Sequence, residues 1–364
     1  MQSKLASEQF FKTIESYQTT PIHYFVNTAT ECSVSSVILK DETKRMNVGS
    51  FKGLGGIFAV AQLIKEYSEQ VLDKNLSYDD LNSDEVREVA SQMTFCCASA
   101  GNHGISVATG AKLFSAKCII FLSKTVPESF KHKLASIGAE VKVEGEMYED
   151  SIAAAAMFCD IEEVILVSDQ SWEGYTRIPQ LISDGYGLIA KELAEQLLKT
   201  NLDDLSSMQD LSNESWPTHV FIQAGVGGMV AGVGAYIMDH WPVKPTIVIV
   251  EPDAAPCLKY SSLERKPALV SGPVSNMGRL DCKQASLLAY QFISKHELKY
   301  ITISDKNASD SELYLEKKNI GTTPSGACGL AGLFKVAQDD VLRKYLNINE
   351  DSRCLVFITE HSEC

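Results

Sequence analysis

The first residue that could do chemistry is a lysine in a small-residue segment. Lys52 follows Asn47-Val48-Gly49-Ser50-Phe51 and stands just before residues 56–64, an apolar run that predicts a helix. Its glycine and serine neighbours leave room for a bulky partner, and an amine in a cleft can act as a nucleophile or a base. A solvated lysine in a turn is the alternative for this segment taken alone.

A second segment joins a predicted strand, residues 93–98, to a predicted helix at 105–112. It reads Ser99-Ala100-Gly101-Asn102-His103-Gly104. A helix start carries unbonded N–H groups and a partial positive charge, so it can hold a carboxylate or a phenolate. An ordinary strand–turn–helix joint would explain the glycines but not the Asn-His pair between them.

A third segment is a glycine-rich loop between a strand at 219–222 and a further helix. Its residues are Gly225, Val226, Gly227, Gly228 and Met229. Consecutive unhindered N–H groups at a helix start form a phosphate cradle. The spacing does not fit the dinucleotide pattern, and no Gly-Lys-Ser/Thr follows, which excludes a nucleotide P-loop.

The fourth segment is Thr323-Pro324-Ser325-Gly326. The hydroxyl of Ser325, fixed after a proline, could pair with an unprotonated ring nitrogen. An N-cap for the helix predicted at 327–337 is the alternative, and Ser325 could serve both roles.

The four segments, in this order, resemble the fold-type II pyridoxal phosphate enzymes, the superfamily of the tryptophan synthase β-subunit. The resemblance covers about residues 40–360. It implies that the cofactor is pyridoxal 5′-phosphate, that Lys52 binds its aldehyde covalently, and that Asn102 contacts its 3′ oxygen. It also implies that residues 225–229 hold the phosphate, and that Ser325 faces the pyridine nitrogen.

Further segments are similar to one branch of this superfamily, the diaminopropionate ammonia-lyases. They are Asp169-Gln170-Ser171-Trp172-Glu173-Gly174-Tyr175, the stretch at 250–258, and Lys40-Asp41-Glu42. Threonine dehydratases and cysteine synthases lack the Trp-Glu-Gly-Tyr stretch. The resemblance implies that Lys52 and Asp169 are catalytic. The substrate-binding residues that it implies are Ser99, Gly101, His103 and Tyr175.

Two positions depart from that branch. Ala100 stands where the branch usually carries an aspartate that is thought to transfer protons, especially for the D-enantiomer. Alanine cannot accept a proton, so we expect a preference for the L-isomer. Arg279 stands where the family usually has an uncharged run, and it either brings a charge near the substrate or lies on the surface.

The expected reaction is α,β-elimination of 2,3-diaminopropionate to pyruvate and ammonia. The cofactor accepts the electron pair left at the substrate Cα. Lys52 is the natural base for the Cα proton, and Asp169 could position or protonate the leaving ammonia. The alternatives are a serine or threonine dehydratase, a β-replacement enzyme, or a paralogue that has lost turnover.

Alternating strands and helices predict an α/β fold of two lobes, each a mostly parallel twisted sheet flanked by helices. We expect the cofactor in the cleft between the lobes, at strand C-terminal ends. The predicted domains are residues 1–50 with 186–364, a large cofactor-binding domain, and residues 51–185, a small mobile one. The predicted strands lie at 93–98, 118–122, 140–143 and 164–167, then at 220–223, 246–250 and 354–358.

Composition favours a cytoplasmic enzyme that acts on small molecules. The net charge of -14 argues against nucleic acid or an anionic membrane as partner. The 10 cysteines form no Cys-x-x-Cys, and the 7 histidines do not recur at ligand spacing, so we expect neither disulfides nor a metal. The N-terminus predicts a short amphipathic helix rather than an export signal. The superfamily resemblance suggests a homodimer.

Overall fold

The computed structural model describes residues 5–162, 164–203 and 216–362. The chain divides into two compact units. Among the described residues, the first unit comprises 5–18, 45–162 and 164–188, and the second comprises 19–44, 189–203 and 216–362. The predicted small domain, 51–185, lies inside the first unit. Residues 5–18, which the sequence placed with the large domain, belong to the first unit, because Phe10 of α1 (Ala6–Phe11) packs against the rings of Phe58 and Phe114.

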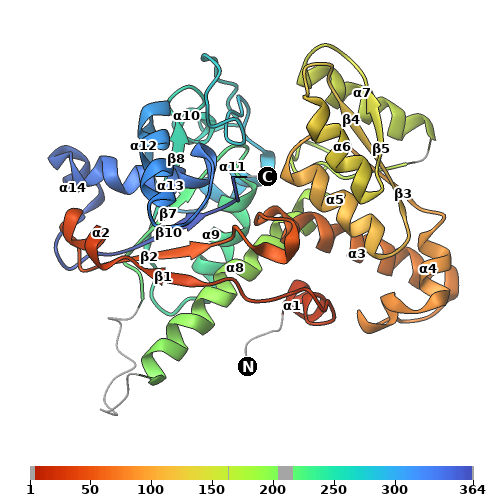
Figure 1. Ribbon diagram of the computed structural model, residues 1–364, viewed down its shortest axis with the longest axis horizontal. Helices are drawn as coiled ribbons and strands as arrows, with labels where there is room; N and C mark the ends of the chain where they lie inside the picture. Colours follow the sequence, from red (N-terminus) through yellow and green to blue (C-terminus); the bar gives the residue numbers. More distant parts are fainter. Residues whose placement is uncertain (1–4, 163, 204–215, 363–364) are drawn as a thin grey trace. The chain divides into compact units, whose positions relative to one another are not determined.

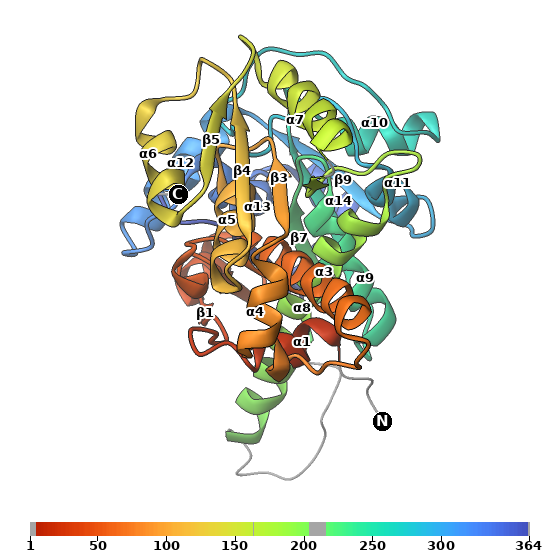
Figure 2. The ribbon, with the colours of Figure 1, turned by 90° about the vertical axis from the view of Figure 1, so that its right-hand side faces the viewer.

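The first unit is built on a four-stranded parallel sheet in the order β5-β4-β3-β6, and Figure 2 labels the first three of these strands. The strands are β3 (Thr94–Cys97), β4 (Lys117–Leu122), β5 (Glu140–Val143) and β6 (Ile165–Leu166). The helices are α3 (Lys52–Leu72), α4 (Asp84–Ala90), α5 (Asn102–Leu113), α6 (Glu128–Ile137) and α7 (Tyr148–Glu162). All four strands predicted for this part of the chain are confirmed.

The order in which the chain adds strands to this sheet reverses between β3 and β6. From β3 the chain steps outward to β4 and β5 through α5 and α6, and it then returns through α7 to β6. Right-handed crossovers therefore put α7 on the opposite face of the sheet from α5 and α6 (Figure 1). The loops that follow β3 and β6 diverge at this point, and such a switch point is where open α/β sheets bind ligands.

The second unit is built on a six-stranded sheet in the order β1-β2-β10-β7-β8-β9, with only the β1–β2 pair antiparallel. The strands are β1 (Ile22–Tyr24), β2 (Ser36–Asp41), β7 (His219–Gln223), β8 (Thr246–Pro252), β9 (Lys299–Ile303) and β10 (Arg353–Ile358). The helices include α2 (Val26–Glu31), α9 (Gly228–His240), α10 (Cys257–Glu264), α11 (Leu287–Ile293), α12 (Asp305–Glu316), α13 (Pro324–Ala337) and α14 (Asp340–Leu346). The sequence analysis had not predicted β1, β2 and β9.

Helix α13 packs on the strands of this sheet and forms the centre of its core. Leu330 and Leu333 of α13 are fully buried in one apolar cluster with Val248 and Val250 of β8 and Val356 of β10. The six-stranded sheet has its own switch point between β7 and β10. The glycine-rich loop and Glu360 follow these two strands, so both lie at this edge of the sheet.

Lys40 of β2 is fully buried and holds the start of the second unit to α8 (Arg177–Asp203). Its Nζ donates to Glu192 Oε2 at 2.8 Å, to Thr20 O at 2.8 Å and to Gln196 Oε1 at 2.9 Å. A buried charge needs such pairing to offset its desolvation. Lys40 therefore has a structural role in the second unit. Across the described ranges, no helix combines the length and the apolarity that crossing a membrane requires.

Candidate active site

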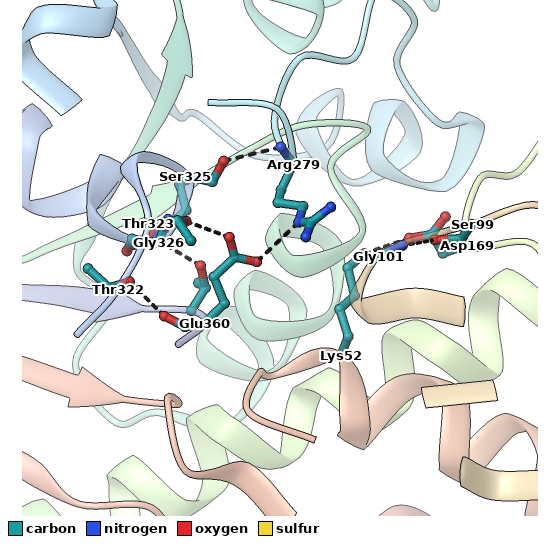
Figure 3. Close-up of polar contacts among 12 residues, drawn as sticks. Lys52, Ser99, Gly101, Asp169, Arg279, Thr322, Thr323, Ser325, Gly326 and Glu360 are labelled. Carbon is teal, nitrogen blue, oxygen red and sulfur yellow. Dashed lines mark hydrogen bonds and ion pairs between the residues drawn. The ribbon is translucent and has the colours of Figure 1, made fainter. Parts of the chain in front are cut away.

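Lys52 is the first residue of α3, so the helix begins at the lysine and not at residue 56 as the sequence suggested. Its Nζ lies 2.5 Å from Asp169 Oδ2, and the two side chains are only 21% and 24% exposed (Figure 3). The rings of Phe51 and Tyr186 flank the amine, with centroids 5.2 and 5.6 Å away. The alternative of a solvated turn lysine is therefore wrong.

Asp169 follows β6 at the switch point of the first unit. Burial acts to raise the pKa of its carboxyl, but the nearby positive charge of Lys52 outweighs burial and lowers the pKa below its ordinary value. The carboxylate is therefore ionised at neutral pH. Two residues predicted to be catalytic, 117 positions apart in sequence, form one ion pair.

The loop after β3 opens α5 without a side-chain cap. Gly101 is the N-cap and Asn102 is the first helical residue, and the cap provides no side chain that accepts the N–H groups of the first turn. The hydroxyl of Ser99 accepts the Gly101 N–H at 3.3 Å, which shapes the loop (Figure 3). A helix start of this kind can bind an anion, and anion binding at α5 stays a prediction.

The other two predicted substrate-binding residues contact the backbone around β6. The Nε2 of His103 lies 2.7 Å from Val167 O. The hydroxyl of Tyr175 donates to Leu166 O at 2.7 Å and accepts the Ser168 N–H at 3.0 Å. Substrate binding by Ser99, Gly101, His103 and Tyr175 stays a prediction.

In the second unit, the glycine-rich loop leads from β7 into α9. Gly227 is the N-cap, with φ +97°, and it offers no side-chain cap to the helix. A Cβ there would lie 2.5 Å from Ala289 Cβ, so only glycine fits without movement. The N–H groups of Gly228, Met229 and Val230 are those that a helix start leaves unbonded, as a phosphate requires.

Ser325 is buried at the second position of α13. The helix is capped by Thr323, whose Oγ1 accepts the Gly326 N–H at 3.0 Å, so the N-cap alternative for Ser325 is wrong. The backbone N–H of Arg279 donates to Ser325 Oγ at 3.1 Å. Since that oxygen already accepts one hydrogen bond, its own O–H is left to donate, as pairing with an unprotonated ring nitrogen requires.

The sequence analysis missed a buried glutamate beside this serine. Glu360 is 3% exposed at its side chain, and its Oε2 lies 3.8 Å from Arg279 Nε. Its Oε1 accepts from Thr323 Oγ1 at 2.5 Å (Figure 3). The side chain of Arg279 is 34% exposed and pairs with Glu360, so this arginine lies at the surface with its charge balanced. Its effect on the substrate stays a prediction.

The chemistry of these groups fits what pyridoxal phosphate requires. Lys52 has a partly buried amine, the start of α9 has N–H groups that would suit a phosphate, and Ser325 has a hydroxyl that would suit an unprotonated ring nitrogen. Their joint binding of the cofactor stays a prediction. Among the residues whose placement is described, no cluster of His, Cys, Asp and Glu is arranged to hold a metal ion.

Comparison with known proteins identifies the class. The profile of the pyridoxal-phosphate dependent enzyme family matches residues 14–360, so the chain belongs to this family and its cofactor is pyridoxal phosphate. The predicted family and fold type are confirmed.

Within the family, the chain is 31% identical to the diaminopropionate ammonia-lyase of Escherichia coli K12, over 99% of this chain and 88% of that protein. The crystal structure of the Escherichia coli enzyme in complex with D-serine superposes with a TM-score of 0.83 at 30% identity, covering 98% and 88% of the two chains. A probable D-serine dehydratase of Oenococcus oeni is 26% identical over 82% of this chain and 68% of that protein.

The glycine loop gives a first prediction. In Gly227→Ala the new methyl group must adopt φ +97° and meets Ala289, so we expect weaker cofactor binding, by about tenfold or more, and a stability loss of about 1–3 kcal/mol. Titration of the cofactor followed by absorbance, with thermal unfolding, measures both. Gly138→Ala is the control, because φ is +106° there and nothing lies within 4 Å. If both variants weaken the cofactor equally, the loop does not hold the phosphate.

Proposed function

We propose that this enzyme eliminates ammonia from 2,3-diaminopropionate, preferably the L-isomer, and yields pyruvate and ammonia. The observation that carries the proposal is the ion pair of Lys52 with Asp169. The lysine amine can act as a base once it is neutral, and the ionised carboxylate beside it can bind a cation. The similarity to the Escherichia coli lyase over almost the whole chain supports the same substrate.

Each group has a separate task. Pyridoxal phosphate, when bound, withdraws the electron pair left at the substrate Cα. Lys52 removes the Cα proton, and Asp169 orients the positively charged β-amine that leaves. The start of α5 binds the substrate carboxylate through its N–H groups. The hydroxyl of Ser325 donates to the ring nitrogen without protonating it, which favours rapid elimination over a long-lived carbanion.

The proposal is tested by adding L-2,3-diaminopropionate to purified protein with its cofactor and measuring pyruvate. We expect turnover on this substrate. Pyruvate from serine, or 2-oxobutyrate from threonine, without pyruvate from diaminopropionate would instead favour a dehydratase, the activity named for the Oenococcus relative. Cofactor binding without a spectral response to any amino acid would favour a paralogue without turnover.

The isomer preference gives a second prediction. Ala100 is half-buried in the loop before α5 and carries no group that could take a proton from a D-isomer. We expect the L-isomer to be consumed roughly 10²-fold faster than the D-isomer, and Ala100→Asp to raise the D-isomer rate by a similar factor, within the usual range for a general base. Ala100→Asn matches its size without the charge. Equal rates of the parent protein on both isomers would contradict the argument.

The cellular location, oligomeric state and partners of the enzyme are part of the same proposal. We expect a cytoplasmic homodimer that acts on free amino acids and binds neither nucleic acid nor membranes. Light scattering of the purified protein measures the oligomeric state, and a monomer at micromolar concentration would contradict this part.

A further inference from the structure

The residues between β6 and the catalytic carboxylate need support from outside their own strand. We call residues 166–169 the Asp169 segment. Strand β6 is 2 residues long, so its ladder to β3 is short. The only further backbone bond described for the segment toward that strand is the Val167 N–H to Cys96 O, at 2.7 Å. A carboxylate that must stay within hydrogen-bonding distance of an amine therefore depends on other groups.

Tyr175 supplies the first of these. Its hydroxyl bridges the segment, donating to Leu166 O at 2.7 Å and accepting from Ser168 N at 3.0 Å. Burial raises the pKa of Tyr175, so the phenol keeps the proton that it donates. The Trp-Glu-Gly-Tyr stretch folds the chain back, because Trp172 and Tyr175 pair through their backbones at 3.2 and 3.0 Å, and their rings stack at 4.3 Å.

His103 supplies the second from the start of α5. Its Nε2 lies 2.7 Å from Val167 O, and a carbonyl oxygen only accepts, so Nε2 carries the proton. Burial lowers the pKa of this imidazole, which is therefore neutral. The Nδ1 atom is buried and has no hydrogen-bond partner among the described residues. The ring thus contributes one directed donor to the segment.

The two side chains form hydrogen bonds with different backbone groups of the Asp169 segment. Tyr175 bonds to the carbonyl of Leu166 and the N–H of Ser168, and His103 bonds to the carbonyl of Val167, the residue between Leu166 and Ser168. The next residue is Asp169, whose carboxylate lies 2.5 Å from the Lys52 amine. Two elements, α5 and the Trp-Glu-Gly-Tyr turn, therefore determine where that carboxylate stands.

We propose that His103 and Tyr175 are positioning residues that hold the Asp169 segment so that the Asp169 carboxylate stays against the Lys52 amine. They act through Asp169 and transfer no proton themselves. The effect on turnover rests on the proposed function, but the effect on the ion pair does not.

The main variant is Tyr175→Phe, which keeps the stacked ring and removes the bridging hydroxyl. The readout is the rate at which a small acylating reagent modifies Lys52 in the full-length, cofactor-free protein, measured by mass spectrometry. We expect the rate to rise about three- to tenfold, because an ammonium that loses its carboxylate partner is more often the free, reactive amine. Asp169→Asn should raise it by at least as much.

The control is Tyr78→Phe. Its hydroxyl donates to Gln62 Oε1 at 2.6 Å in the same unit, and neither residue contacts the ion pair through any described bond. If removing either hydroxyl lowers the thermal midpoint and neither changes Lys52 labelling, Tyr175 is only structural and the proposal is overturned.

A double variant separates action through Asp169 from independent action. In the Asp169→Asn background, Tyr175→Phe should leave labelling within about twofold, because residues that act through one group are not additive. Additive effects would overturn the proposal. With the cofactor bound, we expect Tyr175→Phe to lower kcat roughly tenfold with little change in KM, as small displacements of a catalytic group do.

The histidine is tested by two variants. His103→Gln keeps a neutral N–H donor for Val167 O, whereas His103→Leu removes it. We expect slow, parent-like labelling of Lys52 in the first and faster labelling in the second. Equal labelling in the two variants would overturn the role of His103. None of these labelling experiments involves substrate. A protein that yields no pyruvate would contradict the proposed function but would not affect the inference about His103 and Tyr175.

Discussion

Replacing Lys52 with alanine is expected to abolish covalent attachment of the cofactor and to lower kcat by about 10³-fold or more. In the proposed function the lysine provides both the attachment point and the base for the Cα proton, and a general base alone is worth roughly 10²–10⁴-fold. Borohydride reduction followed by peptide mass spectrometry detects the attachment, and pyruvate formation measures turnover.

The matched control is Lys65→Ala, on the same helix. Lys65 pairs with Glu69 at 2.6 Å and is 17% exposed, close to the exposure of Lys52. It should cost at most a few tenths of a kcal/mol of helix stability and leave attachment unchanged. A reduced adduct on any lysine other than Lys52, or a variant that keeps the yellow absorption band of the attached cofactor, would contradict the assignment on which all other roles depend.

The sequence was sufficient for the fold type because several of the chemical segments join a strand to a helix, although the segment of Ser325 lies between α12 and α13. The predicted strands at 93–98 and 164–167 correspond to β3 and β6, and the motifs follow their ends. Sequence spacing could not show that Lys52 meets Asp169, since the pairing depends on which strands become neighbours in the sheet. That neighbour order is a tertiary property, set by how α7 returns the chain across the sheet.

The second unit shows the same division between local and long-range information. Pro324 at the first turn of α13 was a usable signal that Thr323 is the N-cap, because proline favours that position. Glu360 had a weaker signal, a single acidic residue just after a predicted strand. Only the insertion of β10 between β2 and β7 brings it to the edge where the glycine loop lies. The hydrogen bond from Arg279 to Ser325 spans 46 residues, and no local pattern indicates it.

Changing Asp169 to asparagine is expected to lower kcat/KM for L-2,3-diaminopropionate by roughly 10²-fold. Removing one partner of a hydrogen-bonded charge pair costs about 2–5 kcal/mol. The lowered pKa of Asp169 keeps the carboxylate ionised, so it can hold the β-ammonium group but has no proton to give. The roles of positioning and protonating the leaving group, both open from the sequence, are thereby separable.

A second substrate makes this separation measurable. The β-substituent of 3-chloro-L-alanine carries no positive charge and leaves as chloride, so Asp169→Asn should lower its kcat/KM by less than about tenfold. Asp184→Asn, which removes an exposed carboxylate of the same unit, is the control. Equal losses of kcat/KM on the two substrates would mean that Asp169 serves the lysine alone, because a carboxylate that contacted the leaving group would distinguish an ammonium from a chlorine atom.

The lowered pKa of Asp169 also predicts a pH dependence of stability. The parent protein should lose stability as pH falls below about 4, because a carboxyl with a lowered pKa takes up its proton there only on unfolding. The Asp169→Asn variant, which has no carboxyl at this position, should lose less stability over the same pH range in thermal unfolding.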